Sequence, residues 1–236
     1  MSEEEEPPAV KPEVVAELAR WSTPTVLNGL KRLGVHPADL VSLDRLAVGC
    51  MSPQLGVRVG FAVTRRVVTS RYGSAGNAER GRTAMLGQDL LTQPAPRVLV
   101  VENVGDWRGP VCVFGELVAT VSHALGCVAG ITNGPVRDLP EMERIGFQTY
   151  AGGPGVGGGF VDVVEFGGPV VIGGVRISPG DLLHGDRHGV VRVPAGLAAG
   201  LPAAMREHAD AERRLFEVCR APDFSPEKLA RALENR

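Results

Sequence analysis

Two hydrophobic patterns alternate along the middle of the chain. Continuous apolar runs that are rich in β-branched residues and bounded by turn residues predict buried strands. They span residues 61–70, 97–104, 111–114, 128–132 and 147–151. Between the last three runs, apolar residues recur at helical spacing over 116–125 and 137–145, and a glycine follows each segment. The order strand, helix, strand, helix, strand predicts an α/β core with at least partly parallel strands.

Helical spacing also occurs before this core. Residues 13–33 are expected to form two helical pieces, the second of them capped by Ser22 or Thr23. Residues 77–93 are expected to form a further helix. Its predicted inward residues are Met85, Leu86, Leu90 and Leu91.

The part of the chain that follows the core changes to short apolar segments joined by Gly-Gly or Pro-Gly turns, which predicts antiparallel strands. These strands are expected at 160–166, 170–172, 175–177 and 190–193. A long helix over 201–220 and a last helix over 226–235, capped by Ser225, complete the pattern. Neither a repeat nor a linker interrupts it, so we predict one domain over residues 13–236, preceded by a disordered acidic tail over residues 1–12.

Composition narrows the class of protein. The chain has 236 residues, 44% of them hydrophobic and 22% charged, and its formal net charge is −2. This balance is typical of a globular protein and argues against nucleic acid or a membrane surface as a partner. No apolar run is long enough for a transmembrane helix, and the acidic start is not a signal peptide. The four cysteines lack CxxC spacing, so reduced, buried thiols and a cytoplasmic location are expected.

Glycines and histidines produce three motifs that could mislead. Gly153, Gly155 and Gly158 fit G-x-G-x-x-G, but a strand follows the motif where a dinucleotide site needs a helix, so we predict a flexible turn. His184 and His188 have zinc-site spacing, yet their segment is turn-rich, which favours loop or surface histidines. His123 is expected to be partly buried and satisfied, although it could approach a cavity on its helix.

Two predicted strand-to-helix junctions carry the candidate chemistry. In an open α/β sheet both junctions lie at the carboxyl ends of strands, where ligands collect. Glu116 and Asp138 each supply a carboxylate suited to Mg²⁺, and Arg137 can bind a carboxylate or keto oxygen. The N–H groups of Leu117 and Val118 begin a helix and could hold an anion. Spacing alone explains the same residues equally well as a helix cap, Asp138, beside an ion-paired Arg137.

The residues at these junctions resemble the RraA-like family, which includes the 4-hydroxy-4-methyl-2-oxoglutarate aldolases, metal-dependent (class II) pyruvate aldolases. Aldolase members carry an acidic residue, twenty residues, then Arg-Asp, as in Glu116, Arg137 and Asp138 here. The segments STPTVLNGLKRLG, RVLVVENVG and VIGGVRISPGDLLHGDRHGVVRVP match as well, and the resemblance covers roughly residues 17–195. It implies a swivelling β/β/α-type layered sandwich with mixed sheets and flanking N- and C-terminal helices. It also implies homotrimers or homohexamers with active sites between subunits.

The resemblance assigns roles to single residues. Asp138 would bind Mg²⁺ or Mn²⁺ directly, and Glu116 would bind it through a water molecule. The pyruvoyl end of the substrate would be held by Gly115, Leu117, Val118 and Arg137. Glu141 would contact these residues without itself touching the metal or the substrate. This sequence departs from the family at Asn28 and Asn133, where aspartates are usual, and in the glycine-rich segment 152–159.

The predicted function is therefore a lyase that cleaves 4-hydroxy-2-oxo acids to pyruvate through an enolate, with oxaloacetate decarboxylation as a side activity. Its substrate would be a small 2-oxo acid. Two alternatives stay open. One is a lyase recruited to a specialised pathway with another substrate, and the other is a non-catalytic regulator of a ribonuclease. The sequence contains no plausible cofactor loop for a methyltransferase.

Overall fold

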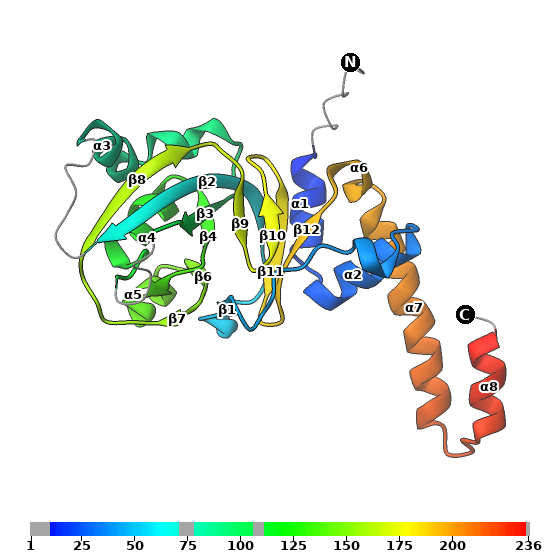
Figure 1. Ribbon diagram of the computed structural model, residues 1–236. Coiled ribbons are helices and arrows are strands. Elements are labelled where there is room, and N and C mark those ends of the chain that lie inside the picture. Colours follow the sequence, from blue (N-terminus) through cyan, green and yellow to red (C-terminus); the bar gives the residue numbers. More distant parts are fainter. Residues whose placement is uncertain (1–9, 71–77, 106–110, 235–236) are drawn as a thin grey trace.

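The computed structural model describes residues 10–70, 78–105 and 111–234. Its centre is a mixed sheet with the strand order β1-β6-β4-β3-β2-β11-β12, and β8 pairs with β2 beside this path. The strands are β1 (Gly49–Cys50), β2 (Arg58–Ser70), β3 (Arg97–Asn103), β4 (Cys127–Thr132), β6 (Gln148–Ala151), β8 (Phe160–Phe166), β11 (Leu182–Asp186) and β12 (Gly189–Val193). Figure 1 shows how the long, curved β2 links the two ends of this sheet.

Strand direction follows the predicted division of the chain. β2, β3, β4 and β6 are parallel neighbours, whereas β11, β12, β8 and β1 pair antiparallel. Strand β2 has 13 residues, so its first part pairs with β11 and its last part with β8. The predicted α/β core with parallel strands is therefore confirmed, and the later strands pair antiparallel as expected.

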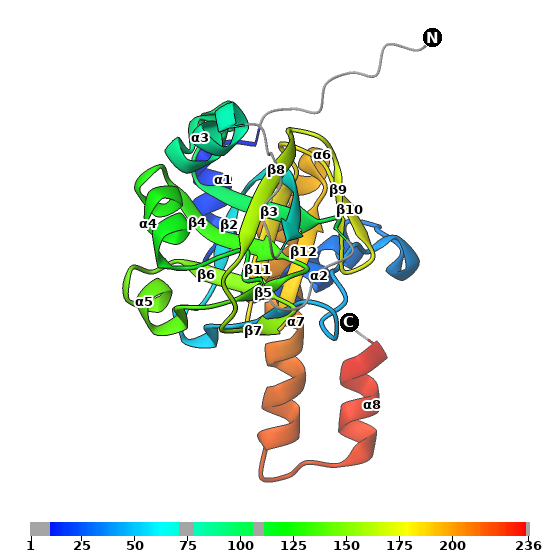
Figure 2. The same ribbon diagram turned by 60° about the vertical axis from the view of Figure 1, so that its left-hand side comes forward.

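Both faces of the sheet are covered, which gives three layers (Figure 2). Alternate residues of β3 divide between the faces, because successive side chains of a strand point to opposite sides. Val98 and Val100 pack against a hairpin of two further strands, while Leu99 and Val101 pack against helices. The hairpin strands are β9 (Val170–Ile172) and β10 (Val175–Ile177), and the helices are α4 (Glu116–Ala124) and α5 (Leu139–Arg144). Helix α3 (Ala78–Leu86) lies beside β8 and α4. This arrangement confirms the layered sandwich.

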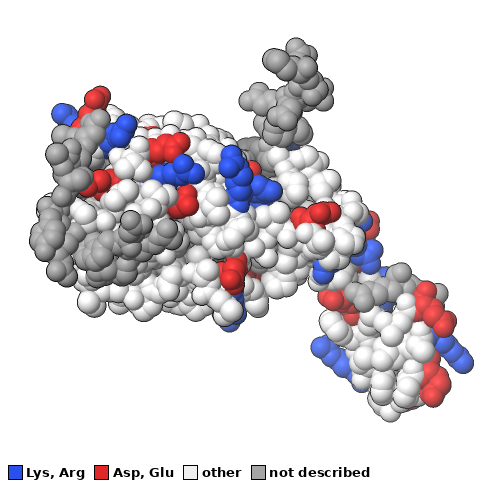
Figure 3. Space-filling view, in the orientation of Figure 1, with Lys and Arg blue, Asp and Glu red and all other residues white. Residues whose placement is uncertain are grey.

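Helices from both ends of the chain cover the β11–β12 end of the sheet. They are α1 (Pro12–Leu18), α2 (Thr23–Arg32), α6 (Ala195–Ala198) and α7 (Leu201–Arg220). Val26 and Leu30 of α2 meet Met205 of α7 in one buried cluster with the sheet. The last part of α7 and helix α8 (Pro226–Glu234) form an arm that extends away from the body (Figure 1). Acidic and basic side chains intermingle on the face of this arm seen in Figure 3.

Helix caps agree with the sequence patterns. The Ser22 hydroxyl accepts the Thr25 N–H at 3.4 Å, and Ser225 accepts the Lys228 N–H at 3.3 Å. A side-chain oxygen at such a position satisfies an N–H group that has no partner within the helix. Both caps are thus confirmed.

Several predictions were wrong at specific places. Residues 111–114 form no strand, and only Phe114 makes a single bridge, to Val136. Helix α3 ends at Leu86 and a short 3-10 helix follows, so the single helix expected over residues 77–93 is interrupted. Leu90 is buried as expected, but three of its predicted companions are half or more exposed. These are Met85, Leu86 and Leu91.

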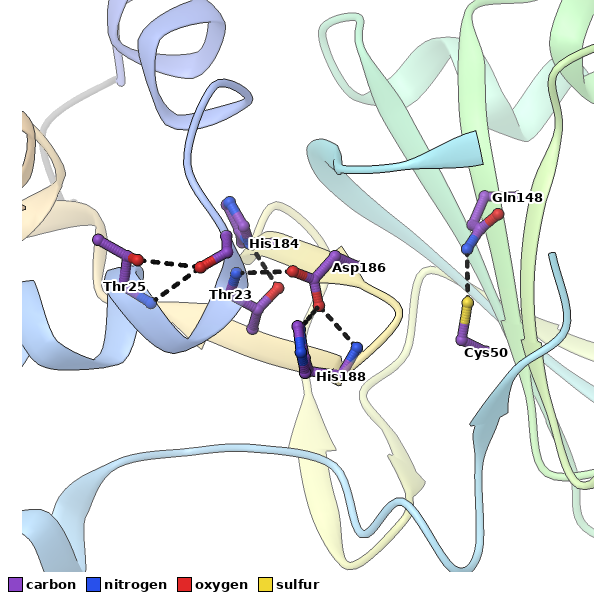
Figure 4. A network of polar contacts seen from close by, with 8 residues as sticks. Thr23, Thr25, Cys50, Gln148, His184, Asp186 and His188 are labelled. Atoms are coloured by element: carbon purple, nitrogen blue, oxygen red, sulfur yellow. Dashed lines mark hydrogen bonds and ion pairs between the residues drawn. The ribbon is translucent and has the colours of Figure 1, made fainter. Parts of the chain in front are cut away.

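The segment predicted as turn-rich around His184 is instead strand β11, and His184 is fully buried. Its ring lies between the Thr23 hydroxyl, 3.0 Å from Nδ1, and the Leu18 carbonyl, 3.1 Å from Nε2 (Figure 4). Since the carbonyl only accepts, Nε2 carries the proton and Nδ1 accepts from Thr23. Burial lowers the pKa of His184 and keeps the ring neutral. The expectation of a loop or surface histidine is correct only for His188, whose side chain is 53% exposed.

Asp186 joins the same network. Its carboxylate accepts the Thr23 N–H at 2.9 Å and the His188 N–H at 2.7 Å. Burial alone would raise the pKa of Asp186, but these hydrogen bonds hold it below its usual value. The network ties the start of α2 to the β11–β12 turn (Figure 4).

The expectations for the N-terminal tail, the cysteines and membrane-spanning helices can also be compared with the structure. Residues 1–9 of the predicted acidic tail lie outside the described residues, and α1 begins at Pro12. All four cysteines are free, but only Cys127 is fully buried and Cys219 is exposed, so the expectation of buried thiols is wrong for Cys219. Among the described helices, none combines the length and the apolar character needed to span a membrane.

Candidate functional site

A cavity of about 530 Å³ lies where α4 begins, and its volume is typical of small-molecule sites. Its walls come from α3, from β2, β3 and β8, and from the segment between residues 111 and 118. These elements lie on the left of Figure 1. The predicted residues Gly115, Glu116, Leu117, Val118, Arg137 and Asp138 all line it. The structure therefore brings the starts of α4 and α5 together at one cavity.

Asp138 has a distinctive backbone. Its φ of 56° lies in the left-handed region, and it is the one residue other than glycine with positive φ among those described. Such a conformation costs free energy and is common at functional sites. It directs the side chain away from its own helix α5, where it makes no cap. Asp138 Oδ2 instead accepts the Glu116 N–H of α4 at 3.0 Å.

This hydrogen bond corrects one part of the helix-cap explanation, the identity of the capped helix, and agrees with the rest of it. Asp138 caps a helix, but it is the neighbouring helix α4, and Arg137 Nε lies 3.5 Å from the same carboxylate oxygen. Arg137 and Asp138 keep 48% and 36% of their side chains exposed, so both remain accessible from the cavity. No described residue hydrogen-bonds Oδ1 of Asp138, which leaves one oxygen for a ligand.

Close packing holds these groups in place. Arg137 N–H donates to the Phe114 carbonyl at 3.1 Å, beside the bridge between Phe114 and Val136. A β-carbon at Gly115 would lie 2.7 Å from Asp138 Oδ2, although the extended backbone at Gly115 suits any residue. Only glycine therefore allows the carboxylate to approach the start of α4.

The first turn of α4 offers free donors. Ala119 N–H is the first to bond inside the helix, to the Gly115 carbonyl at 3.0 Å. Leu117 and Val118 precede it, so their N–H groups have no intrahelical partner. These amides and the helix dipole favour an anion at the cavity end of α4.

A buried ion pair that the sequence analysis missed lies behind the cavity. Arg65 of β2 lines the cavity and binds Asp89 with two hydrogen bonds, Nε to Oδ2 at 2.6 Å and Nη2 to Oδ1 at 2.7 Å. Their side chains are only 7% and 8% exposed. The sequence feature that could have indicated this ion pair is the presence of two arginines, Arg65 and Arg66, inside an otherwise apolar, β-branched strand.

Asn133, one of the departures from the family, has a structural role. Its amide oxygen accepts the Asn103 N–H at 2.8 Å, and its Nδ2 donates to the Asn103 carbonyl at 3.0 Å. An aspartate could not make the second bond, because an ionised carboxylate only accepts. Asn133 thus joins the ends of β3 and β4 near the site.

Other candidate residues lie apart from the cavity. Glu141 pairs with Arg144 at 3.7 Å and is not among the residues that line the cavity, so its supporting role remains a prediction. His123 is exposed, which contradicts the expectation that it is partly buried. Cys112 lines the cavity, and burial raises the pKa of its thiol, which favours the protonated, unreactive form.

The residues present suit a hard divalent cation. Among the described residues, Glu116 and Asp138 are the carboxylates that line the cavity, and Mg²⁺ often takes one or two carboxylates and retains several waters. No cluster of three or more His, Cys, Asp or Glu side chains suited to a metal occurs among the described residues. A metal bound here would therefore have these two carboxylates as protein ligands and would retain several waters.

Known proteins resemble the chain in sequence. A protein of Halalkalibacterium halodurans, provisionally named a 4-hydroxy-4-methyl-2-oxoglutarate aldolase, is 30% identical over 124 residues, which cover 50% of this chain and 56% of that protein. The chain thus spans little more than half the length of that relative. A Burkholderia mallei protein with the same provisional name is 31% identical over 155 residues, covering 63% of this chain and 87% of that protein.

Solved structures resemble the fold. An uncharacterized protein from Pseudomonas syringae pv. tomato matches over 100% of both chains, with a TM-score of 0.75 and 22% identity. Streptomyces coelicolor RraAS2, described as an unusual member of the RNase ES inhibitor RraA protein family, matches over 87% of this chain and 96% of its own, with a TM-score of 0.66 and 23% identity. The family model described as Aldolase/RraA matches residues 30–192, and the chain therefore belongs to the RraA-like family.

Proposed function

We propose that this protein is a divalent-metal-dependent lyase that cleaves 4-hydroxy-2-oxo acids to pyruvate, with oxaloacetate decarboxylation as a side activity. One observation carries the proposal. Asp138, held in a left-handed conformation, and Arg137 lie side by side at the start of α4 and line one cavity. The provisional aldolase names of the two sequence relatives support the same class of reaction.

The proposal gives each of these residues a role. Asp138 and Glu116 would hold Mg²⁺ or Mn²⁺, and the bound metal would supply positive charge that polarises the 2-oxo acid. Arg137 and the N–H groups of Leu117 and Val118 would bind the carboxylate and orient the pyruvoyl group. Arg137 and these N–H groups would also stabilise the negative charge that develops on the enolate oxygen when the C3–C4 bond breaks.

The proton movements complete the reaction. The 4-hydroxyl group loses its proton as C4 becomes a carbonyl, and C3 keeps the electron pair and then receives a proton. Glu116 lines the cavity at the start of α4 and is the candidate for the group that moves these protons.

A pyruvate-release assay tests the proposal directly. Pyruvate should form from 4-hydroxy-4-methyl-2-oxoglutarate or oxaloacetate, stop with EDTA and return with added Mg²⁺. Asp138→Asn should lower kcat/KM by about 100-fold or more, since it removes a charged ligand from the reacting centre. Glu143→Gln provides the matched control, because Glu143 lies on α5 but does not line the cavity. Full activity of the Asp138 variant would refute the metal-site assignment.

A second candidate function is regulation of a ribonuclease. Its support is the likeness to RraAS2, which at 23% identity concerns the fold alone. The Glu116, Arg137 and Asp138 set lining a cavity favours catalysis over this alternative. Inhibition of a purified ribonuclease E by this protein, unchanged in the Asp138 variant, would favour regulation. We also propose a homotrimer or homohexamer, to be measured by size-exclusion chromatography with light scattering.

A further inference from the structure

The cavity has two chemically different parts. Part of its lining is charged, at Glu116, Arg137 and Asp138. Another part, the aliphatic wall, consists of apolar side chains from the strands, and Val67 of β2 and Val101 of β3 are almost completely buried, at 2% and 3% exposure. A volume of about 530 Å³ is larger than a pyruvoyl group needs, so the aliphatic wall faces the remainder of any bound substrate.

Strand β8 and helix α3 extend this wall. Val161 and Val163 of β8 line the cavity, and so does Met85 of α3. Met85 and Val161 are 54% and 37% exposed, which is unusual for large apolar side chains. Their exposure at the cavity provides an apolar surface that a ligand would cover.

The one charged side chain among the described residues of the aliphatic wall is neutralised by an ion pair. Among the described residues of this wall only Arg65 is charged, and Asp89 binds it with two hydrogen bonds in a buried pair. A second substrate carboxylate at this wall would lose its water and would meet the charge of Asp89 as well as that of Arg65. Without an unneutralised partner, this burial of a carboxylate is unfavourable.

We propose that the cavity selects 4-hydroxy-2-oxo acids whose end remote from the 2-oxo acid group is apolar, an alkyl or aryl group, and not a second carboxylate. This specificity rests on the proposed lyase function. The reaction breaks the C3–C4 bond and yields pyruvate and an apolar aldehyde or ketone. The 4-hydroxyl proton leaves as the new carbonyl forms, and C3 receives a proton, so the atoms balance without a co-reactant.

Binding of uncleavable 2-oxo acids tests the apolar wall independently of catalysis. Calorimetric titration with saturating Mg²⁺ would compare pyruvate, 2-oxobutanoate, 2-oxopentanoate, 2-oxohexanoate and 2-oxoglutarate. Affinity should rise by about fourfold for each methylene group that becomes buried. The dicarboxylate 2-oxoglutarate should bind about tenfold or more weakly than 2-oxopentanoate, because no described residue of the aliphatic wall offers its second carboxylate an unpaired positive charge. Stronger binding of 2-oxoglutarate would overturn the proposal.

A pair of variants on β8 locates the effect. Val161 and Val164 are similarly exposed, at 37% and 39%, but only Val161 lines the cavity. Val161→Lys should weaken 2-oxohexanoate and strengthen 2-oxoglutarate, reversing their order, whereas Val164→Lys should leave both affinities unchanged. Equal effects of the two substitutions would show that the wall does not determine specificity.

Steady-state kinetics separates this proposal from the function on which it rests. The substrates would be 4-hydroxy-2-oxohexanoate and the dicarboxylates 4-hydroxy-2-oxoglutarate and 4-hydroxy-4-methyl-2-oxoglutarate. Higher kcat/KM for the alkyl substrate, by about tenfold or more, supports the apolar specificity. Equal or higher values for the dicarboxylates refute the specificity and leave the lyase function standing. Release of pyruvate from none of the substrates refutes the lyase function itself.

Discussion

Replacing Gly115 with alanine should disable the proposed site without unfolding the protein. The new β-carbon would lie 2.7 Å from Asp138 Oδ2 and 3.2 Å from Arg137 Nε. An ordinary carbon–oxygen contact is about 3.3–3.6 Å, so the Asp138 carboxylate has to move by roughly 0.5–1 Å. A displacement of this size at a reacting centre costs on the order of 10- to 100-fold in rate.

The cost in stability should be small. Gly115 has φ −152° and ψ −177°, an extended backbone that alanine adopts without strain. The displaced Asp138 side chain is 36% exposed, and the interaction lost is its hydrogen bond from the Glu116 N–H. Loss of one such bond costs about 0.5–1.5 kcal/mol in the free energy of unfolding.

The assay measures pyruvate release with saturating Mg²⁺, and urea unfolding checks the fold of each variant. Gly158→Ala is the matched control, because its β-carbon would lie 3.7 Å from Arg137 Nη1, an ordinary contact. Gly158→Ala should retain kcat/KM within about twofold, in keeping with a substitution outside the reacting groups. Wild-type activity of Gly115→Ala, or equal losses in both variants, would refute the role given to the Asp138 position.

Three further predictions concern stability and can each be measured by urea unfolding. Asp89→Asn should lower the free energy of unfolding by about 3–5 kcal/mol, because the buried Arg65 charge loses its partner, and a loss below about 1 kcal/mol would contradict this. Burial lowers the pKa of His184 below 6.5, so the unfolded chain binds a proton more readily than the folded protein does. Stability should therefore hold above pH 6.5 and fall as the pH drops below it, and His184→Gln should flatten this dependence. Gly29→Ala should cost about 1–3 kcal/mol through overpacking, since its β-carbon would lie 2.7 Å from a side chain of α7, whereas Gly196→Ala meets nothing within 4 Å and should be neutral.

The hydrophobic pattern alone predicted most of the elements, since a strand or helix that buries one face needs a local repeat of apolar residues. It failed where a distant residue set the local choice. Strand β11 contains Gly185, which resembles a turn residue, yet a β-carbon there would lie 2.6 Å from the Tyr150 hydroxyl. The glycine is needed for close approach within the sheet, and only the folded chain brings Tyr150 to it.

His184 illustrates the same limit for a polar residue. A histidine between two glycine-containing turns indicated the surface, but its hydrogen-bond partners Thr23 and Leu18 are 161 and 166 residues away in sequence. Buried polar groups are satisfied by whatever the tertiary fold places beside them. No local pattern in the sequence contains that information.

The candidate site also has some features that the sequence predicted and others that only the folded structure shows. The sequence alone placed Glu116 at the start of one helix and Asp138 at the start of the next, although the strand expected before Glu116 does not form. Only the tertiary structure decided that Asp138 adopts a left-handed backbone and accepts the Glu116 N–H, 22 residues earlier in the chain. It also decided that Asp89 neutralises Arg65 behind an aliphatic wall. Local patterns specify which faces are apolar, whereas ion pairs and site geometry depend on contacts between residues that are distant in sequence and meet only in the folded chain.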